Sequence, residues 1–173
     1  LIRTYKPTQS PYYELTPTQT RNIFSLNNWS DIIGYHTRNI PHKGHEYIQK
    51  KSLEETNADG IFISPVIGIK KNNDFTSNVI INCYESLIQD GFYNSFGVVL
   101  GSFNTYSRYS GPREAVFTAI CRKNFGCNQF IVGRDHTGFG DYYSSDASQN
   151  IFKVLDIGMK ILTFGEVGYC TNK

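Results

Sequence analysis

Residues 35–45 read Tyr-His-Thr-Arg-Asn-Ile-Pro-His-Lys-Gly-His, directly after a short apolar run. His42 and His45 stand three residues apart at the expected start of a helix, which would put both imidazoles on one helical face. A helix N-terminus favours an anion, because its first N–H groups are unpaired and its dipole is positive there. With Arg38 and Lys43 beside them, the two histidines predict a phosphate site. The alternative is a loop that carries surface histidines.

Short apolar runs alternate with helical patterns along the rest of the chain. The runs are 32–35, 61–64, 96–100, 129–132 and 161–164, and the helical candidates are 18–26, 43–55, 77–89, 113–123 and 147–155. Buried parallel strands are short and rich in β-branched and aromatic residues, as these runs are. Alternation of strand and helix predicts an α/β fold, a parallel sheet of about five strands flanked by helices.

Polar segments follow several of the expected strands, where parallel sheets bind ligands. The segments are 36–45, 65–71 and 133–140. The last reads Gly-Arg-Asp-His-Thr-Gly-Phe-Gly, and its glycines would supply positive φ and let a ligand approach the backbone closely. Arg134 offers a phosphate partner, Asp135 an acceptor for a ribose hydroxyl, and His136 an imidazole. The alternative is a glycine-rich turn in which Arg134 and Asp135 pair with each other.

Composition narrows the class of protein. The 173 residues are 39% hydrophobic and 18% charged, as in one globular domain. A net charge of +2 predicts no general nucleic-acid surface. No apolar run approaches the ~20 residues of a membrane span, and no signal peptide is visible. The four cysteines lack the spacing of a disulfide framework, so we expect reduced thiols in a cytoplasmic protein.

Two further segments are typical of helix ends. Residues 110–115 read Ser-Gly-Pro-Arg-Glu-Ala, a helix start with proline and an acidic residue in the first turn and with Arg113 in solvent. Residues 122–127 read Arg-Lys-Asn-Phe-Gly-Cys, a basic last turn followed by a glycine stop. We assign both segments to structure.

Together these segments resemble the catalytic domain of the ATP sulfurylase (sulfate adenylyltransferase) family from Thr16 onward. The family patterns Q-T-R-N-P-x-H-x-x-H, A-G-P-R-E-A, R-K-N-[YF]-G-C and G-R-D-H-A-G are matched at 36–45, 110–115, 122–127 and 133–138, and shorter patterns at 65–68 and 83–85. Ordered matches over ~120 residues are more specific than any one motif. The resemblance implies a Rossmann-like nucleotidyltransferase fold with an H-x-G-H motif over 16–173. Residues 1–15 would be a linker from an N-terminal domain, and a C-terminal segment would follow 173.

The resemblance also implies an activity and the residues that perform it. The reaction is transfer of AMP from ATP to sulfate, which yields adenylyl sulfate and pyrophosphate. The catalytic residues would be Thr37, Arg38, Asn39, His42 and His45. The nucleotide would be bound by His42, His45, Gly133, Arg134, Asp135 and His136, and the acceptor oxyanion by His36, Arg38 and Thr137. Mg²⁺ would arrive with ATP rather than in a protein metal site.

Departures from the family pattern keep alternatives open. His36 stands where the family has glutamine, and Thr137 where it has alanine. The acceptor could therefore be a different oxyanion, or the enzyme could use a different nucleotide. A third alternative is a non-catalytic nucleotide-binding module. His36 could titrate on binding a dianion, or stay neutral and donate one hydrogen bond. Cys170 matches the first ligand of a zinc loop found in some relatives, but a site would need further residues. The oligomeric state stays open, a homo-oligomer included.

Overall fold

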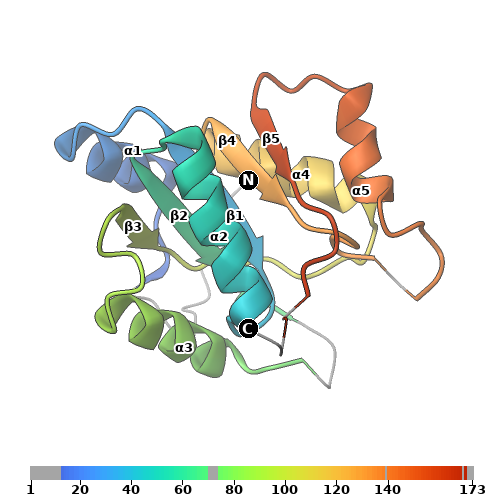
Figure 1. The fold of residues 1–173 in the computed structure, drawn as a ribbon, viewed down its shortest axis with the longest axis horizontal. Coiled ribbons are helices and arrows are strands. Elements are labelled where there is room, and N and C mark those ends of the chain that lie inside the picture. Colours follow the sequence, from blue (N-terminus) through green and yellow to red (C-terminus); the bar gives the residue numbers. More distant parts are fainter. Residues whose placement is uncertain (1–12, 70–73, 139, 169, 171–173) are drawn as a thin grey trace, which may run out of the picture.

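The computed structural model describes residues 13–69, 74–138, 140–168 and 170, and it shows one parallel sheet flanked by helices (Figure 1). The strands are β1 (Ile32–Thr37), β2 (Gly60–Pro65), β3 (Gly97–Leu100), β4 (Gln129–Val132) and β5 (Lys160–Thr163). They pair in the order β3-β2-β1-β4-β5, and every pairing is parallel. The predicted fold class and the predicted number of strands are confirmed.

Helices connect the strands where the sequence predicts them. They are α1 (Pro17–Leu26), α2 (Lys43–Thr56), α3 (Ser77–Gln89), α4 (Pro112–Asn124) and α5 (Ala147–Asn150), followed by the 3₁₀ turn η2 (Ile151–Lys153). The helix predicted over 147–155 is therefore too long. The chain tightens after Asn150, and the Val154 N–H bonds to the Ile151 carbonyl three residues back, a 3₁₀ ending common at helix C-termini.

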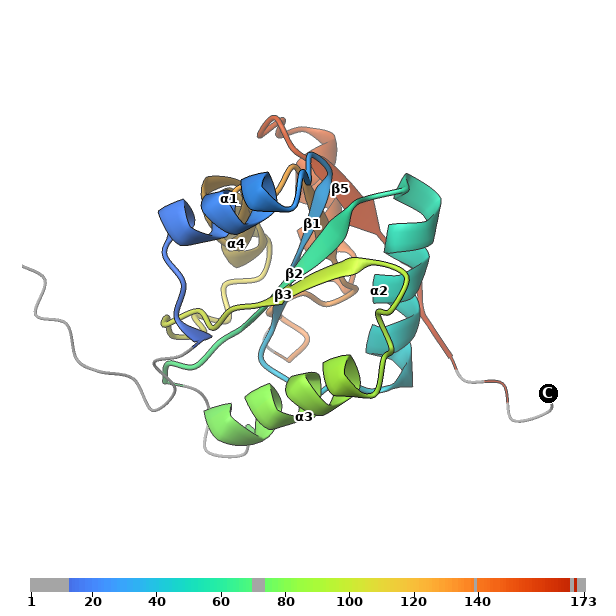
Figure 2. The same cartoon turned by 90° about the vertical axis from the view of Figure 1, so that its left-hand side faces the viewer.

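Each face of the sheet packs on its own pair of helices (Figure 2). Helices α2 and α3 cover one face, where Ile33 and Ile61 of the sheet join Leu53 and Ile80 in one buried cluster. Helices α1 and α4 cover the other, where two smaller buried clusters lie. Alternate residues of a strand point to opposite faces, so the side chain of His36 belongs to the α4 face while its neighbour Tyr35 belongs to the α2 face.

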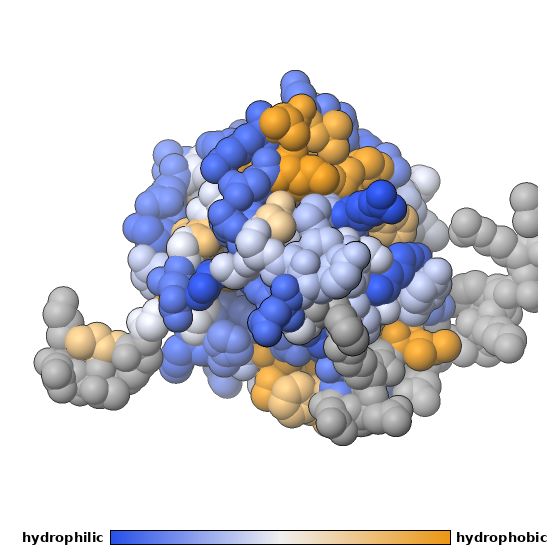
Figure 3. Space-filling model, turned by 90° about the vertical axis from the view of Figure 1, so that its right-hand side faces the viewer, coloured by the Kyte–Doolittle hydropathy of each residue, from blue (hydrophilic) through white to orange (hydrophobic). Residues whose placement is uncertain are grey.

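The central strands and the edge strands differ in burial. All residues of β1, β2 and β4 are buried, whereas β3 is half-buried and β5 exposes Lys160 and Thr163. The prediction of five buried strands is therefore wrong for β3 and β5. Both are edge strands with a neighbour on one side only. The side of the molecule that carries α5 is mostly hydrophilic, with an apolar patch at its upper edge (Figure 3).

Strand order places a crevice between β1 and β4. From β1 the chain moves outward through β2 to β3, and it then returns to the other side of β1 for β4 and β5. Open α/β sheets bind ligands at such a reversal, beyond the carboxyl ends of the strands. In the part of the chain that the structure describes, no helix is long and apolar enough to cross a membrane.

Candidate active site

A cavity of about 600 Å³ opens at this reversal of strand order, within the usual size range of ligand pockets. Its lining comes from residues 35–48, 131–145 and 164–167. All predicted site residues line it: His36, Thr37, Arg38, Asn39, His42, His45, Gly133, Arg134, Asp135, His136 and Thr137. The described part of the predicted segment 65–71 contributes no lining residue, and residues 70–71 lie outside the described chain.

The two histidines of the H-x-G-H motif stack on each other at the start of α2. Their ring centroids are 3.7 Å apart. His42 is the N-cap, and its Nδ1 accepts from the Gly44 N–H at 3.2 Å, which leaves its ring proton on Nε2. His45 Nδ1 lies 3.3 Å from the Ile40 carbonyl. Burial first, and His42 second, lower the pKa of His45 to about 4. Their part in phosphate binding stays a prediction.

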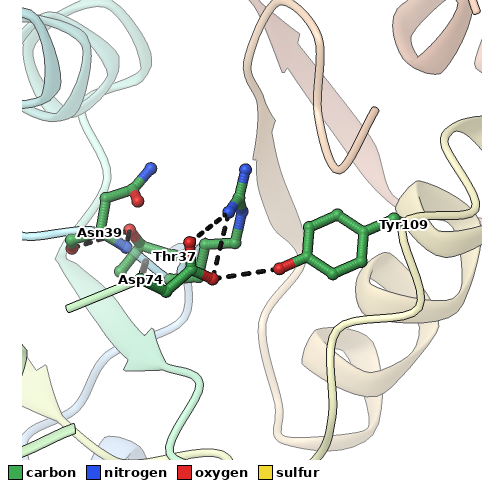
Figure 4. Close-up of polar contacts among 5 residues, drawn as sticks. Thr37, Asn39, Asp74 and Tyr109 are labelled. Carbon is green, nitrogen blue, oxygen red and sulfur yellow. Dashed lines mark hydrogen bonds and ion pairs between the residues drawn. The ribbon is translucent and has the colours of Figure 1, made fainter. Parts of the chain in front are cut away.

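Arg38 is held by two residues that the sequence analysis did not identify. Its Nη1 donates to both carboxylate oxygens of Asp74 at 3.0 and 3.2 Å, and the Tyr109 hydroxyl donates to Asp74 Oδ2 at 3.0 Å (Figure 4). The guanidinium also lies 5.1 Å from the Tyr109 ring centroid. Neither Asp74 nor Tyr109 belongs to a motif, so no local signal marked them. Within the described residues, Nε and Nη2 of Arg38 keep no partner, so they stay available for an oxyanion.

Thr37 and Asn39 form a tight turn beside this arginine (Figure 4). Thr37 Oγ1 accepts from the Asn39 N–H at 3.1 Å and lies 3.2 Å from the Asn39 carbonyl. This local bonding fixes the backbone between β1 and α2, because a short polar side chain satisfies the groups that leave the strand.

The loop after β4 has a strained backbone at two residues that are not glycine. Asp135 and Thr137 have φ of 53° and 54°. Of the glycines predicted to supply positive φ, only Gly140 does so, at 49°, and the expectation is wrong for Gly133 and Gly138. Gly138 leaves room for the Asp135 carboxylate instead: an added Cβ would lie 1.9 Å from Asp135 Oδ1. Strain of this kind clusters at ligand-binding loops.

Arg134 pairs with Glu166 rather than with Asp135. Its Nη1 lies 2.9 Å from Glu166 Oε2, and the two side chains are 48% and 80% exposed. The alternative of an Arg134–Asp135 pair is therefore wrong. Because both partners are so exposed, the ion pair is weak and does not fix the position of the Arg134 guanidinium.

His36 is buried among positively charged or imidazole groups. Arg122 Nη2 donates to His36 Nδ1 at 2.9 Å, and the His136 ring centroid lies 5.8 Å from that of His36. Burial first, then Arg122, His136 and Arg38, lower the pKa of His36 well below its usual value. Burial also lowers the pKa of His136 to about 4. The neutral alternative for His36 is therefore favoured while the cavity is empty.

Arg122 is buried behind His36, between α4 and the sheet, rather than exposed at the end of a helix. It is fully buried, its guanidinium stacks 4.3 Å from the Phe103 ring centroid, and burial lowers its pKa to about 10. Its position does have a sequence signal: Ala115, Ala119 and Arg122 share helical spacing and all face the sheet. The assignment to structure missed its contact with His36.

The described residues contain no group of three or more His, Cys, Asp or Glu side chains that could hold a metal ion. Cys170 is exposed, and Lys173 lies outside the described chain. Whether further residues complete a zinc site with Cys170 stays untested.

Comparison with known protein families matches residues 11–173 to the family described as ATP-sulfurylase. The chain belongs to the ATP-sulfurylase family. It is 42% identical over 165 residues to the sulfate adenylyltransferase of Acaryochloris marina, which covers 94% of this chain and 42% of that protein. It is 46% identical over 159 residues to that of Ignicoccus hospitalis, which covers 91% of this chain and 41% of that protein. The chain thus spans about two fifths of these ATP-sulfurylase relatives.

A solved structure shares the fold. The hexameric APS kinase from Thiobacillus denitrificans superposes with a TM-score of 0.61 over 90% of this chain and 28% of that chain, at 19% sequence identity. This similarity supports the architecture of the ATP-sulfurylase chain described above.

Proposed function

We propose that this chain forms the nucleotidyl-transfer site of a sulfate adenylyltransferase. An oxygen of sulfate attacks the α-phosphorus of ATP, a new S–O–P linkage forms, and the bond from that phosphorus to the bridging oxygen of pyrophosphate breaks. The products are adenylyl sulfate and pyrophosphate.

One observation carries the proposal. The two family segments that lie about a hundred residues apart, 36–45 and 133–137, line a single cavity at the reversal of strand order. The cavity brings imidazoles and guanidinium groups together at a helix start, an arrangement suited to a triphosphate and a second anion. Because the chain is 42% identical to a sulfate adenylyltransferase over most of its length, the corresponding reaction is the natural assignment.

The residues divide between the two substrates along the cavity. Arg38 would bind the acceptor through its free nitrogens, with His36 and Thr137 beside it. Thr37 and Asn39 would hold the α-phosphate, and His42 and His45 the β- and γ-phosphates. Gly133, Arg134, Asp135 and His136 would surround the nucleoside. Sulfate is a weak base and carries no proton at neutral pH, so the protein needs no general base. Positioning and charge stabilisation account for the acceleration of the reaction.

Mg²⁺ would enter as part of the ATP complex. The cavity lining contains the carboxylates of Asp135, Asp141 and Glu166, and Glu166 is paired with Arg134. Mg²⁺ commonly takes few protein carboxylates and several phosphate oxygens and waters. The ion would offset charge on the leaving pyrophosphate.

The test is release of pyrophosphate from ATP in the presence of sulfate. We expect sulfate-dependent release that falls ~10²-fold in both His42→Ala and His45→Ala, the usual loss for one preorganised charge-stabilising donor. Arg113→Ala, on the exposed side of α4, is the control. Sulfate-independent turnover, or full activity of both histidine variants, would contradict the proposal.

A second acceptor is the main competing assignment, and His36 is the observation that favours it. An imidazole differs from the glutamine amide of the family pattern in shape and in its capacity to take up a proton. The same assay with selenate, molybdate, phosphate and phosphonates in place of sulfate separates the two assignments. Nucleotide binding without turnover on any acceptor would indicate a non-catalytic module.

A further inference from the structure

The guanidinium of Arg122 is fully buried, and no carboxylate of the described residues pairs with it. Its Nε and Nη1 have no hydrogen-bond partner among the described residues, and the side chain is flanked by the rings of Phe62, Phe103 and Phe125. A buried charge is costly unless it is paired or hydrogen-bonded. Among the described residues, this guanidinium makes one hydrogen bond, from Nη2 to His36 Nδ1 at 2.9 Å. Within the described residues, this buried cation is therefore stabilised by its hydrogen bond to His36 and by the aromatic rings around it.

A glycine in β1 makes this contact possible. Gly34 lies two residues before His36 and so on the same face of the sheet. A Cβ at position 34 would lie 2.9 Å from Arg122 Cβ and 3.1 Å from Arg122 Cγ. Helix α4 can thus approach β1 closely enough for the arginine stem to cross position 34 and for its head to reach position 36.

The chemistry of the two partners determines where the His36 proton resides. A guanidinium carries only N–H donors and accepts nothing. His36 Nδ1 must therefore present its lone pair to Arg122, and the ring proton of neutral His36 lies on Nε2. That second nitrogen bonds to no described residue, while His36 itself lines the cavity.

We propose that Arg122 is a positioning residue that locks His36 in the Nε2–H tautomer, so that His36 donates one neutral hydrogen bond to the acceptor oxyanion. The identity of the acceptor rests on the proposed function; the tautomer does not. His36 would thereby act as a neutral hydrogen-bond donor, as an amide does, while its other ring nitrogen, Nδ1, accepts from Arg122. Specificity for the acceptor would depend on the Arg122–His36 pair together with Arg38.

The surroundings of His36 act in the same direction. Arg122 comes from α4, Arg38 directly follows β1 and His136 lies in the loop after β4, and each disfavours protonation of His36. Phe103 packs edge-on against the ring at 6.2 Å between centroids. Among the residues that the structure describes, no carboxylate is one of the groups that shift the pKa of His36.

The direct test is ¹⁵N NMR of the histidine side chains in the wild-type protein. The chain has four histidines, and His36→Gln assigns the signal of His36 by its disappearance. We expect a protonated Nε2 and an unprotonated Nδ1 from pH 5.5 to 8.5, with no titration across this range. A protonated Nδ1, or a mixture of tautomers, would overturn the proposal, and this measurement needs no Arg122 variant to fold.

A pair of arginine variants tests the cause of the tautomer. In Arg122→Met the stem remains but the donor is gone, so His36 should become a mixture of tautomers and should titrate closer to neutrality. Arg113→Met, the same change on the exposed side of α4, should leave the His36 signals as in wild type. A pure Nε2–H tautomer in folded Arg122→Met would overturn the role given to Arg122.

Two variants at position 36 test which ring nitrogen serves the acceptor. The glutamine amide reaches about as far as Nε2, whereas the asparagine amide reaches only as far as Nδ1. We expect His36→Asn to raise KM for sulfate on the order of tenfold or more, the loss for one hydrogen bond to a charged group, and His36→Gln to raise it much less. The reverse order would contradict donation from Nε2.

The outcomes separate this inference from the proposed function. If wild-type protein shows the Nε2–H tautomer but turns over no oxyanion, the proposed function fails and the tautomer stands. Titration with sulfate should also shift the Nε2–H signal of His36 in the wild-type protein. Turnover of sulfate without that shift would remove His36 from the acceptor site.

Discussion

At the scale of single residues, His45 shows how a hydrogen bond decides what an imidazole can do. Its Nδ1 faces the Ile40 carbonyl, so neutral His45 carries its proton there and presents a lone pair at Nε2. A lone pair repels phosphate oxygens. His45 can therefore bind the triphosphate as a donor only after it takes up a second proton.

This reasoning predicts that nucleotide binding at His45 takes up a proton. Burial holds the pKa of free His45 at about 4, and a bound triphosphate should raise it. ATP affinity should then be highest at acidic pH and fall as pH rises through the bound-state pKa, by at most about tenfold per pH unit. Calorimetry in buffers of different ionisation enthalpy measures the proton uptake. Because ATP itself protonates, the decisive quantity is the difference from His45→Gln, and equal uptake by both proteins would refute the prediction.

Arg38 gives a second prediction at this scale. Its Nη1 is bound by Asp74, and its Nε and Nη2 form the paired edge that matches a tetrahedral oxyanion. Lysine has one point charge and no such edge. Arg38→Lys should therefore weaken acceptor binding by about tenfold or more and ATP binding much less, measured by calorimetry with each ligand. Arg113→Lys, the same change at an exposed position of α4, is the matched control, and equal losses for both ligands in Arg38→Lys would contradict the assignment.

The sequence predicted the residues that line the cavity better than the residues that hold those side chains in place. Motif residues such as Arg38 and His42 were identified because their chemistry and their place after a strand are both local signals. Asp74 and Tyr109 escaped notice because their contact with Arg38 arises only when separate loops meet in the fold. Arg122 was noticed but assigned to a helix end, because its burial depends on Gly34 in another element.

At the scale of secondary-structure elements, that approach of α4 to β1 can be tested directly. An added methyl group at Gly34 would meet Arg122 Cβ at 2.9 Å. We expect Gly34→Ala to destabilise the fold by about 1–3 kcal/mol, the usual cost of overpacking a core, measured by urea unfolding. Gly133→Ala is the matched control, because an added Cβ there meets nothing within 4 Å. Equal stability of the two variants would show that α4 does not pack closely on β1.

Element types were predictable from sequence and element ends were less so. Helical periodicity and apolar runs identified the α-helices and strands of the described residues, because burial against a sheet imposes those patterns. The exposure of β5 followed from its position at the edge of the sheet, and the early end of α5 followed from the 3₁₀ turn after Asn150. An edge strand such as β5 has the same apolar composition as a central one, so composition alone could not tell them apart.

At the scale of the whole molecule, the site places several uncharged histidines in the interior. Burial lowers the pKa of His36 well below 6.5 and lowers the pKa of His45 and of His136 to about 4. In the unfolded chain each titrates near 6.5. The folded state therefore resists protons that the unfolded state accepts, so the free energy of unfolding depends on pH.

The sign of this linkage gives the last prediction. Because the folded pKa values are lowered, the contribution to stability is fully present above pH 6.5 and is lost as pH falls from there toward 4 and below. Each such histidine adds at most about 1.4 kcal/mol per pH unit to the decrease of the free energy of unfolding as the pH falls. His36→Gln restores the residue of the family pattern and removes one titrating group, so its free energy of unfolding should depend less steeply on pH by about that amount between pH 6 and 4.5. Urea unfolding at half-unit pH steps measures both slopes, and parallel lines for the two proteins would mean that His36 is not held neutral in the folded protein.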